Sequence, residues 1–246
     1  RNPEDDIRDG YVAIDFGTSS TVVAFKEQGR DQLLRIGLAD FSLPPQPKHY
    51  ENPTVLEFLD FARLLADWQG HAYRPMVSWD SVHCSHEARA SLRDNDTNPK
   101  VVGSVMERLK QWALRGSQHA VVSITDQDNG LEYRLAPLTE RDPVKGKPLA
   151  VGADYPFDPI ELYAWFLGMT INWRSRGLFL HYFMTFPVKY SNEVKRKILS
   201  SFRRGLQRSL PDTLLASPRF AEFSLEERAS EPAAFAASAL QAYGIE

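Results

Sequence analysis

The stretch at residues 11–26, YVAIDFGTSSTVVAFK, decides the fold that the sequence predicts. Its first residues are apolar or small and its last part is rich in β-branched residues, as expected of two buried strands. The polar residues between them, 15–20, are too few for anything except a tight turn. The stretch therefore predicts a β-hairpin whose turn reads Asp-Phe-Gly-Thr-Ser-Ser.

This turn has the chemistry of a phosphate-and-magnesium site. Gly17 has no Cβ, so the backbone can approach a bound group closely there. The small residues after it leave amide N–H groups that can converge on one anion, and Thr18, Ser19 and Ser20 add hydroxyl donors. Asp15 supplies a carboxylate that can hold the water shell of a divalent cation. Asp-x-Gly is also an ordinary hairpin turn, so the stretch alone leaves both interpretations open.

Composition sets the outer limits of the prediction. The 246 residues carry a net charge of −3, with 43% hydrophobic and 25% charged residues, which is ordinary for a soluble globular protein. The charge balance gives no electrostatic reason to expect nucleic acid or an anionic membrane as partner. The single cysteine, Cys84, excludes an internal disulfide, and no apolar run approaches the ~20 residues of a membrane span. We therefore expect a cytoplasmic protein.

The middle of the chain predicts a mixture of short elements. A third strand at 33–36 would complete an antiparallel meander, and a proline-rich loop follows. The elements predicted next are a strand at 54–59, helices at 85–93 and 103–114, and strands at 120–125 and 131–135. The last two flank Asp128-Asn129-Gly130, which is a hairpin signal.

The last third predicts alternating helices and strands. Asp158 is placed to cap a helix that has Pro159 at its first position and ends near 176–177. Glu161, three residues after Asp158, completes a capping box. A strand at 178–186, a helix at 192–208, a strand at 220–225 and an alanine-rich helix after 230 follow. The helix at 192–208 is expected to bury Val194, Ile198, Phe202 and Leu206. Crossover connections of this kind require the later strands to be parallel, which indicates an α/β fold.

Four segments resemble the actin, sugar-kinase and heat-shock ATPase superfamily, and most of all the seventy-kilodalton heat-shock (DnaK-like) chaperones. They are the phosphate turn at 14–19, PTVLEF at 53–58, FMTFP at 183–187 with the helix after it, and EPAA at 231–234 with AYG at 242–244. The resemblance spans nearly the whole chain but only the first lobe of that family's ATPase domain. It implies a ribonuclease-H-like (actin-like ATPase) lobe of βββαβαβα order, formed by 1–37 and 151–246, with an inserted α+β subdomain at 38–150.

The resemblance also implies a ligand and roles for particular residues. ATP and Mg²⁺ would be the cofactors, with Asp15 organising the magnesium water shell. The phosphate cradle would consist of the small residues of the turn, Gly17, Thr18, Ser19 and Ser20. Glu231 would help to position the attacking water, and Arg89 is the nearest match to a lysine that lies near the γ-phosphate. Arginine cannot hold water as a compact ammonium does, so this replacement argues against fast hydrolysis.

The implied partners follow from the same resemblance. A second ATPase lobe and a partner domain, neither contained in this chain, would complete a chaperone ATPase that hydrolyses ATP to switch conformation. Clients or co-chaperones would be its protein partners. The first lobe by itself would bind ATP weakly and turn it over negligibly, because half of the nucleotide clamp would be missing.

A rival hypothesis is a non-catalytic actin-like scaffold or pseudo-ATPase used for protein association, for which Arg89 is one motive. Sugar-kinase chemistry is a weaker third possibility, since no sugar-site signature is visible.

Other clusters receive structural interpretations. His83, Cys84 and His86 match no standard zinc spacing. The basic residues of the 192–208 helix are expected on its solvent face: Lys195, Arg196, Lys197, Arg203, Arg204 and Arg208. The five tryptophans are too scattered for a stacking platform and are interpreted as core or interface residues.

Overall fold

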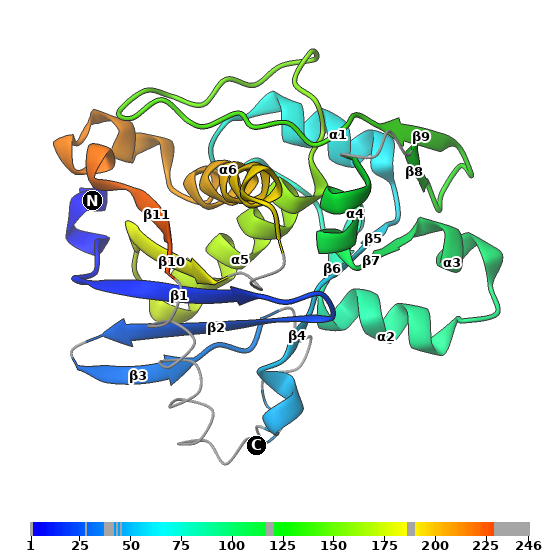
Figure 1. Cartoon of the computed structure of the whole chain (residues 1–246), viewed down its shortest axis with the longest axis horizontal. Helices are drawn as coiled ribbons and strands as arrows, with labels where there is room; N and C mark the ends of the chain where they lie inside the picture. The colour runs from blue at the N-terminus through cyan, green and yellow to red at the C-terminus, as the bar shows by residue number, and fades with distance from the viewer. Residues whose placement is uncertain are drawn as a thin grey trace.

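A mixed β-sheet is the central layer of the computed structural model, which describes residues 2–27, 29–36, 42, 44, 46–116, 121–185 and 190–228 (Figure 1). Its strands follow the order β11-β10-β1-β2-β3, and β4 pairs with the start of β2. Their bounds are β1 Gly10–Phe16, β2 Ser20–Glu27, β3 Arg30–Leu33, β4 Asn52–Pro53, β10 His181–Thr185 and β11 Ser224–Glu227. β10 is parallel to β1 and β11, whereas β2 is antiparallel to β1, β3 and β4.

The strand β1 lies in the middle of this sheet because its side chains are apolar on both faces. Val12, Ala13 and Ile14 are all buried, which is the pattern of a strand covered on both sides. Its pairing with β2 confirms the predicted hairpin, and its pairing with β10 confirms that the later strands are parallel.

Helices α5 (Pro159–Ser175) and α6 (Asn192–Arg208) pack together on one face of the sheet. Phe16 of β1 contacts both, with ring centroids 6.1 Å from Tyr163 and 4.9 Å from Phe202. Asp158 caps α5 as predicted, accepting hydrogen bonds from the amides of residues 160 and 161. The predicted bounds of α6 and its four buried apolar residues are confirmed.

The segment between β4 and α5 adds a second, smaller sheet with its own helices. This sheet has the order β6-β5-β7, from β5 Val55–Phe58, β6 Val82–Cys84 and β7 Val105–Glu107. The helices are α1 Phe61–Gly70, α2 His86–Asp94, α3 Pro99–Ser104 and α4 Leu109–Gly116, and β8 Val122–Thr125 pairs with β9 Glu132–Leu135 in the predicted hairpin. Short 3₁₀ turns occupy Pro3–Asp6, Pro47–His49, Asp212–Ala216 and Pro218–Glu222.

One apolar core joins both parts of the described chain. The same cluster contains Val12 and Ile14 of the central sheet and Leu56, Leu109 and Trp112 of the inserted segment. The division at 37 and 38 stays a prediction, but β4, from the predicted insertion, belongs to the central sheet. Three of the tryptophans are buried (Trp68, Trp112 and Trp165), whereas Trp79 and Trp173 are exposed.

Several predicted boundaries are wrong because tertiary pairing overrides the local pattern. The expected helix at 103–114 is divided into the end of α3, the strand β7 and most of α4, since residues 105–107 pair with β5. Arg108, with a φ of 56°, separates β7 from α4. The third strand occupies residues 30–33, not 33–36, and the expected strand at 220–225 starts as a 3₁₀ turn before β11. The helix predicted after 230 lies outside the described residues.

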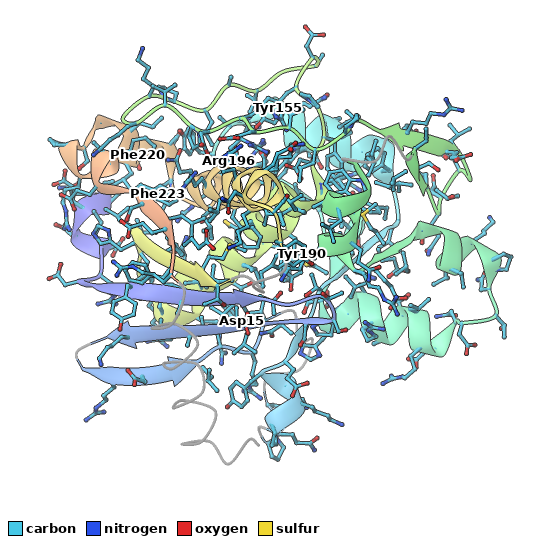
Figure 2. The ribbon with its side chains drawn as sticks, in the orientation of Figure 1. Asp15, Tyr155, Tyr190, Arg196, Phe220 and Phe223 are labelled. Carbon is cyan, nitrogen blue, oxygen red and sulfur yellow. The ribbon has the colours of Figure 1, made fainter. Side chains whose placement is uncertain are left out.

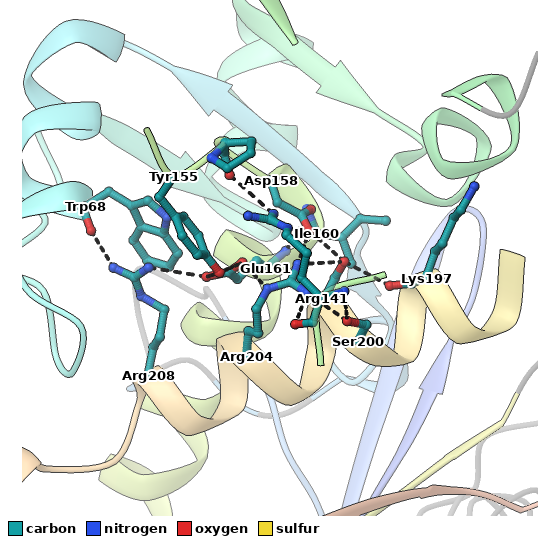
Figure 3. Close-up of polar contacts among 12 residues, drawn as sticks. Trp68, Arg141, Tyr155, Asp158, Ile160, Glu161, Lys197, Ser200, Arg204 and Arg208 are labelled. Atoms are coloured by element: carbon teal, nitrogen blue, oxygen red, sulfur yellow. Dashed lines mark hydrogen bonds and ion pairs between the residues drawn. The ribbon is translucent and has the colours of Figure 1, made fainter. Parts of the chain in front are cut away.

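A buried cluster of charged side chains holds α5 against α6, as Figure 3 shows. The Arg204 guanidinium places Nη2 2.7 Å from Asp158 Oδ2 and Nε 2.6 Å from Glu161 Oε2. Arg208 places Nη1 3.2 Å from Glu161 Oε1, and its guanidinium carbon lies 3.6 Å from the centroid of the Trp68 ring. All four charged residues of the cluster are at most 2% exposed.

This cluster corrects two predictions. Arg204 and Arg208 do not belong to the solvent face of α6, because each meets a buried carboxylate of α5. The Glu161 carboxylate does not reach back to cap the helix; it binds the two arginines and accepts a hydrogen bond from the Tyr155 hydroxyl at 3.1 Å. A sequence pattern cannot show this, since the ion pairs join residues more than 40 positions apart.

In the described part of the chain, every helix is too short or too polar to cross a lipid bilayer.

Replacing Arg204 by methionine is expected to lower the free energy of unfolding by roughly 3–5 kcal/mol, because Asp158 and Glu161 would keep buried charges without their partner. The matched control is Arg196→Met on the same helix, whose guanidinium pairs with Glu140 at the surface. That loss should stay below about 1 kcal/mol. Urea unfolding of both variants measures the difference, and equal losses would contradict the assigned role of the buried pair.

Candidate functional site

The predicted turn lies at the carboxyl end of β1, where a parallel neighbour also ends. Asp15 is paired in register with Thr185, close to the end of β10. The Thr185 hydroxyl donates a hydrogen bond to Asp15 Oδ1 at 2.9 Å, which fixes the orientation of the exposed carboxylate. Ligands of α/β sheets bind at such edges, where strand direction or order changes, and β1 separates parallel β10 from antiparallel β2.

The turn itself is tight and requires glycine. A Cβ at Gly17 would clash with the backbone oxygen of Ser20. Thr54 holds the turn from the next segment, donating from its hydroxyl to the Gly17 carbonyl at 3.2 Å and from its amide to the Ser19 carbonyl at 3.1 Å. Within the described residues, no backbone carbonyl accepts a hydrogen bond from the amides of Gly17, Thr18 or Ser19. Backbone N–H groups of such a turn can bind an anion.

A buried asparagine, which the sequence analysis did not single out, fixes the segment that carries Thr54. Asn52 donates from Nδ2 to the carbonyls of Thr21 at 2.9 Å and Tyr50 at 3.1 Å. Its Oδ1 accepts from the Ile36 amide at 2.6 Å. One side chain thus ties β2 to the two chain segments beside it, and the Thr54 hydroxyl lies 2.9 Å from that of Thr21.

Lys110 is the residue of this site that sequence reasoning missed. It lies in the first turn of α4, is fully buried, and donates from Nζ to the carbonyl of Phe16. Burial lowers the pKa of Lys110 to about 8, and the negative charge of Asp15 opposes that shift. The Tyr190 ring centroid lies 4.9 Å from the ammonium nitrogen. The inserted segment therefore brings a cation to the carboxyl end of β1, against the Phe16 carbonyl.

The remaining predicted site residues have different positions. Gly17, Thr18, Ser19 and Ser20 are contiguous in the turn, so the hairpin alone brings them next to Asp15. Arg89 lies on α2 and places Nη1 2.6 Å from Glu107 Oε1, with both side chains partly exposed. Glu231 lies outside the described residues, and its position opposite the turn stays a prediction. Figure 2 labels Asp15 on β1 and Tyr190 at the start of α6.

Of the histidine–cysteine cluster, His83 contacts a buried carboxylate on β5. Glu57 accepts hydrogen bonds from His83 Nδ1 at 2.9 Å, Ser91 at 2.7 Å and Gln127 at 3.0 Å. Burial raises the pKa of the Cys84 thiol, which keeps it protonated. Among the described residues there is no group of three side chains placed to hold a metal ion.

The chain matches no protein-family model, and no curated protein is significantly similar to it. The interpretation of the turn therefore depends on its geometry and on the residues that surround it.

Gly17→Ala tests the tightness of the turn. We expect a loss of roughly 1–3 kcal/mol in the free energy of unfolding, because the new Cβ would meet the Ser20 carbonyl oxygen. Gly70→Ala at the end of α1 is the control, since a Cβ there meets nothing within 4 Å. Thermal and urea unfolding measure the stability of the two variants. Equal stability of Gly17→Ala and Gly70→Ala would contradict the packing argument.

The His83–Glu57 pair makes stability depend on pH in a defined direction. The hydrogen bond to Glu57 raises the pKa of His83 above its ordinary 6.5, although burial opposes the shift. Burial raises the pKa of Glu57, but the hydrogen bonds from His83, Ser91 and Gln127 outweigh it and lower the pKa below 4.5. The contribution of His83 is therefore complete below pH 6.5 and is lost as pH rises through its folded-state pKa, while Glu57 stays ionised.

We expect the difference in the free energy of unfolding between wild type and His83→Gln to shrink as pH is raised from about 6 to about 9. Urea unfolding of both proteins at each pH measures this difference. His181→Gln is the control, because that exposed imidazole contacts the Ser224 hydroxyl and forms no ion pair among the described residues. A difference that is constant across this pH range would show that the ion pair does not contribute.

Proposed function

We propose that this chain forms the first, phosphate-binding lobe of an actin-like ATPase of the seventy-kilodalton heat-shock (DnaK-like) type. The order of elements supports the proposal: three antiparallel strands, a long insertion, then a helix, a parallel strand, a helix and a further parallel strand. This is the arrangement that a ribonuclease-H-like lobe with an inserted subdomain requires. The parent ATPase would use hydrolysis to drive a conformational switch in a partner domain, with client or co-chaperone proteins as partners.

The observation that carries the proposal is the convergence of an exposed carboxylate, the turn amides and a buried cation at one strand end. Asp15 is held there by Thr185, and no backbone carbonyl of the described residues accepts from the amides of residues 17–19 beside it. Magnesium, when bound, would neutralise charge on the phosphate oxygens. Asp15 would hold its water shell, and Gly17, Thr18, Ser19 and Ser20 would bind the phosphates of ATP through N–H and O–H groups.

Lys110 takes the role that the sequence analysis gave to Arg89. Its ammonium lies at the turn and is influenced by the charge of Asp15, whereas the Arg89 guanidinium is engaged by Glu107. An ammonium is a compact donor with three N–H bonds, whereas a guanidinium is a planar fork. The arginine at position 89 was one reason to consider a non-catalytic scaffold, and this reason no longer applies in the proposed function. Glu231 keeps its proposed role in positioning the attacking water.

Titration with Mg-ATP, followed by ¹H–¹⁵N NMR, tests the proposal. We expect weak, saturable binding with shifts centred on the amides of Gly17, Thr18 and Ser19, because the proposed second half of the clamp is not in this chain. Asp15→Asn should weaken binding roughly ten-fold, or about 1.4 kcal/mol.

Asp96→Asn, at an exposed position on the loop between α2 and α3, is the matched control and should leave the affinity unchanged. Shifts that avoid the turn, or equal affinities in the two variants, would refute phosphate binding at this site.

A further inference from the structure

A long loop covers α6 on the side that faces away from β1 (Figure 1). It comprises residues 136–158, which join β9 to α5 and contain no helix or strand. Connections of more than about 12–15 residues without secondary structure are uncommon in compact domains and are usually either functional or disordered. A loop of this length that the rest of the chain holds in place therefore points to a function.

Hydrogen bonds hold the loop against α6 and against the segment that follows α1. The Arg141 amide donates to Ser200 Oγ at 2.7 Å, and the Arg204 guanidinium donates to the Arg141 carbonyl at 2.9 Å. Further along the loop, the Leu149 amide donates to the Tyr73 hydroxyl at 3.0 Å. The loop is thus fixed near its start and again in its middle.

Between these contacts the loop leaves a cavity of about 540 Å³. Binding sites for small molecules have volumes of roughly 300–1,000 Å³ and mostly apolar walls. This wall is mostly apolar as well, because it is formed in large part by Val144, Pro148, Leu149, Ala150, Val151 and Pro156. Val144 is 62% exposed, so part of the apolar wall is open to a ligand.

The polar feature of this cavity is the Arg141 guanidinium in its wall. Its carbon Cζ lies 4.5 Å from the centroid of the Tyr155 ring, and Nη2 donates to the Pro156 carbonyl at 3.3 Å (Figure 3). Its Nε and Nη1 are buried and have no hydrogen-bond partner among the described residues. Buried polar groups almost always have a partner, so these two N–H donors indicate an acceptor that the chain does not supply.

The charge of Arg141 is also without a matching acid. The buried cluster between α5 and α6 is already balanced, with two carboxylates against two guanidinium groups. Arg141 adds a third guanidinium, which forms no ion pair within the described part of the chain. Of the two acids in the cavity wall, Asp142 pairs with Arg203 at 2.9 Å and Asp154 is exposed to solvent. One positive charge in the wall is therefore left for an anion.

We propose that this cavity binds a small organic carboxylate with an apolar chain, whose carboxylate pairs with the Arg141 guanidinium and whose chain lies against the apolar wall. Stacking on Tyr155 occupies the face of the guanidinium and leaves its in-plane N–H groups, which match a carboxylate in geometry. A single uncompensated positive charge suits a monoanion better than a phosphate group of higher charge.

This site is independent of the proposed phosphate site. Figure 2 shows Tyr155 and Asp15 on opposite sides of α6. Octanoate binding is therefore expected to be the same in wild type and in Asp15→Asn, whatever the outcome of the titration with Mg-ATP.

The first experiment compares sodium octanoate with 1-octanol, which has the same chain length and no charge, by ¹H–¹⁵N NMR and calorimetry. We expect saturable octanoate binding with shifts centred on the amides of residues 149–155. Octanol should bind roughly ten-fold more weakly, because it cannot pair with the guanidinium. Absence of saturable octanoate binding, shifts elsewhere in the chain, or equal affinities for the two probes would overturn the proposal.

The second experiment removes the cation. Arg141→Met keeps a long side chain and should weaken octanoate binding roughly ten-fold while leaving octanol binding unchanged. Arg134→Met, at an exposed position on β9, is the matched control and should leave both affinities unchanged. Equal octanoate affinities in the two variants would overturn the role of Arg141.

A third variant tests the cavity without changing any charge. Ala150→Trp at an exposed position of the wall should fill the cavity and weaken the binding of octanoate and octanol alike. Undiminished octanoate binding in Ala150→Trp would overturn the assignment of the ligand to this cavity. This variant and the comparison of the two probes on wild type decide the proposal even where Arg141→Met fails to fold.

Discussion

The buried ion pairs between α5 and α6 are the constraint on which the rest of the structure depends. Two carboxylates and two guanidinium groups are removed from water between these helices. Each charge would be costly alone, so the helices are stable only in the register that brings all four together. The same register lets the helix backbones approach closely, because a Cβ at Gly205 would clash with the Glu161 carbonyl oxygen. Charge pairing and close packing thus specify one arrangement of the helix layer.

That arrangement determines where the site residues lie. From α5, the Tyr163 hydroxyl donates to the Pro53 carbonyl at 3.2 Å, next to the threonine that holds the turn. From α6, Phe202 packs on Phe16 at the end of β1. Both helices therefore reach the strand end that carries Asp15. A loss of register between them would displace the supports of the turn as well as the core.

The sequence predicts the local features of this protein well and its long-range contacts poorly. The hairpin around the turn, the capped start of α5 and the bounds of α6 depend on neighbouring residues, and the structure confirms all three. Asn52 and Lys110 gave no usable signal, because the contacts that tie them to the central sheet, with Thr21 and Phe16, lie 31 and 94 positions away in the chain. Lys110 was also hidden by the wrong prediction of one continuous helix at 103–114. Arg204 was misplaced for a similar reason, since a basic residue is assigned to solvent unless a distant acid is known to meet it.

The candidate site therefore combines a turn that the sequence predicts with residues that only the three-dimensional structure brings to it. The turn at residues 15–20 is formed by one continuous stretch of sequence, so a motif search alone suggests phosphate binding. The same short stretch also fits an ordinary hairpin turn. Lys110 comes from a separate element and reaches the end of β1 only through the packed core shared by the central sheet and the inserted segment. A simple hairpin gains nothing from a buried ammonium beside its end, because desolvating that charge is costly. In the proposed function, the inserted segment would therefore supply the cation of the phosphate site, and the turn would supply the other groups.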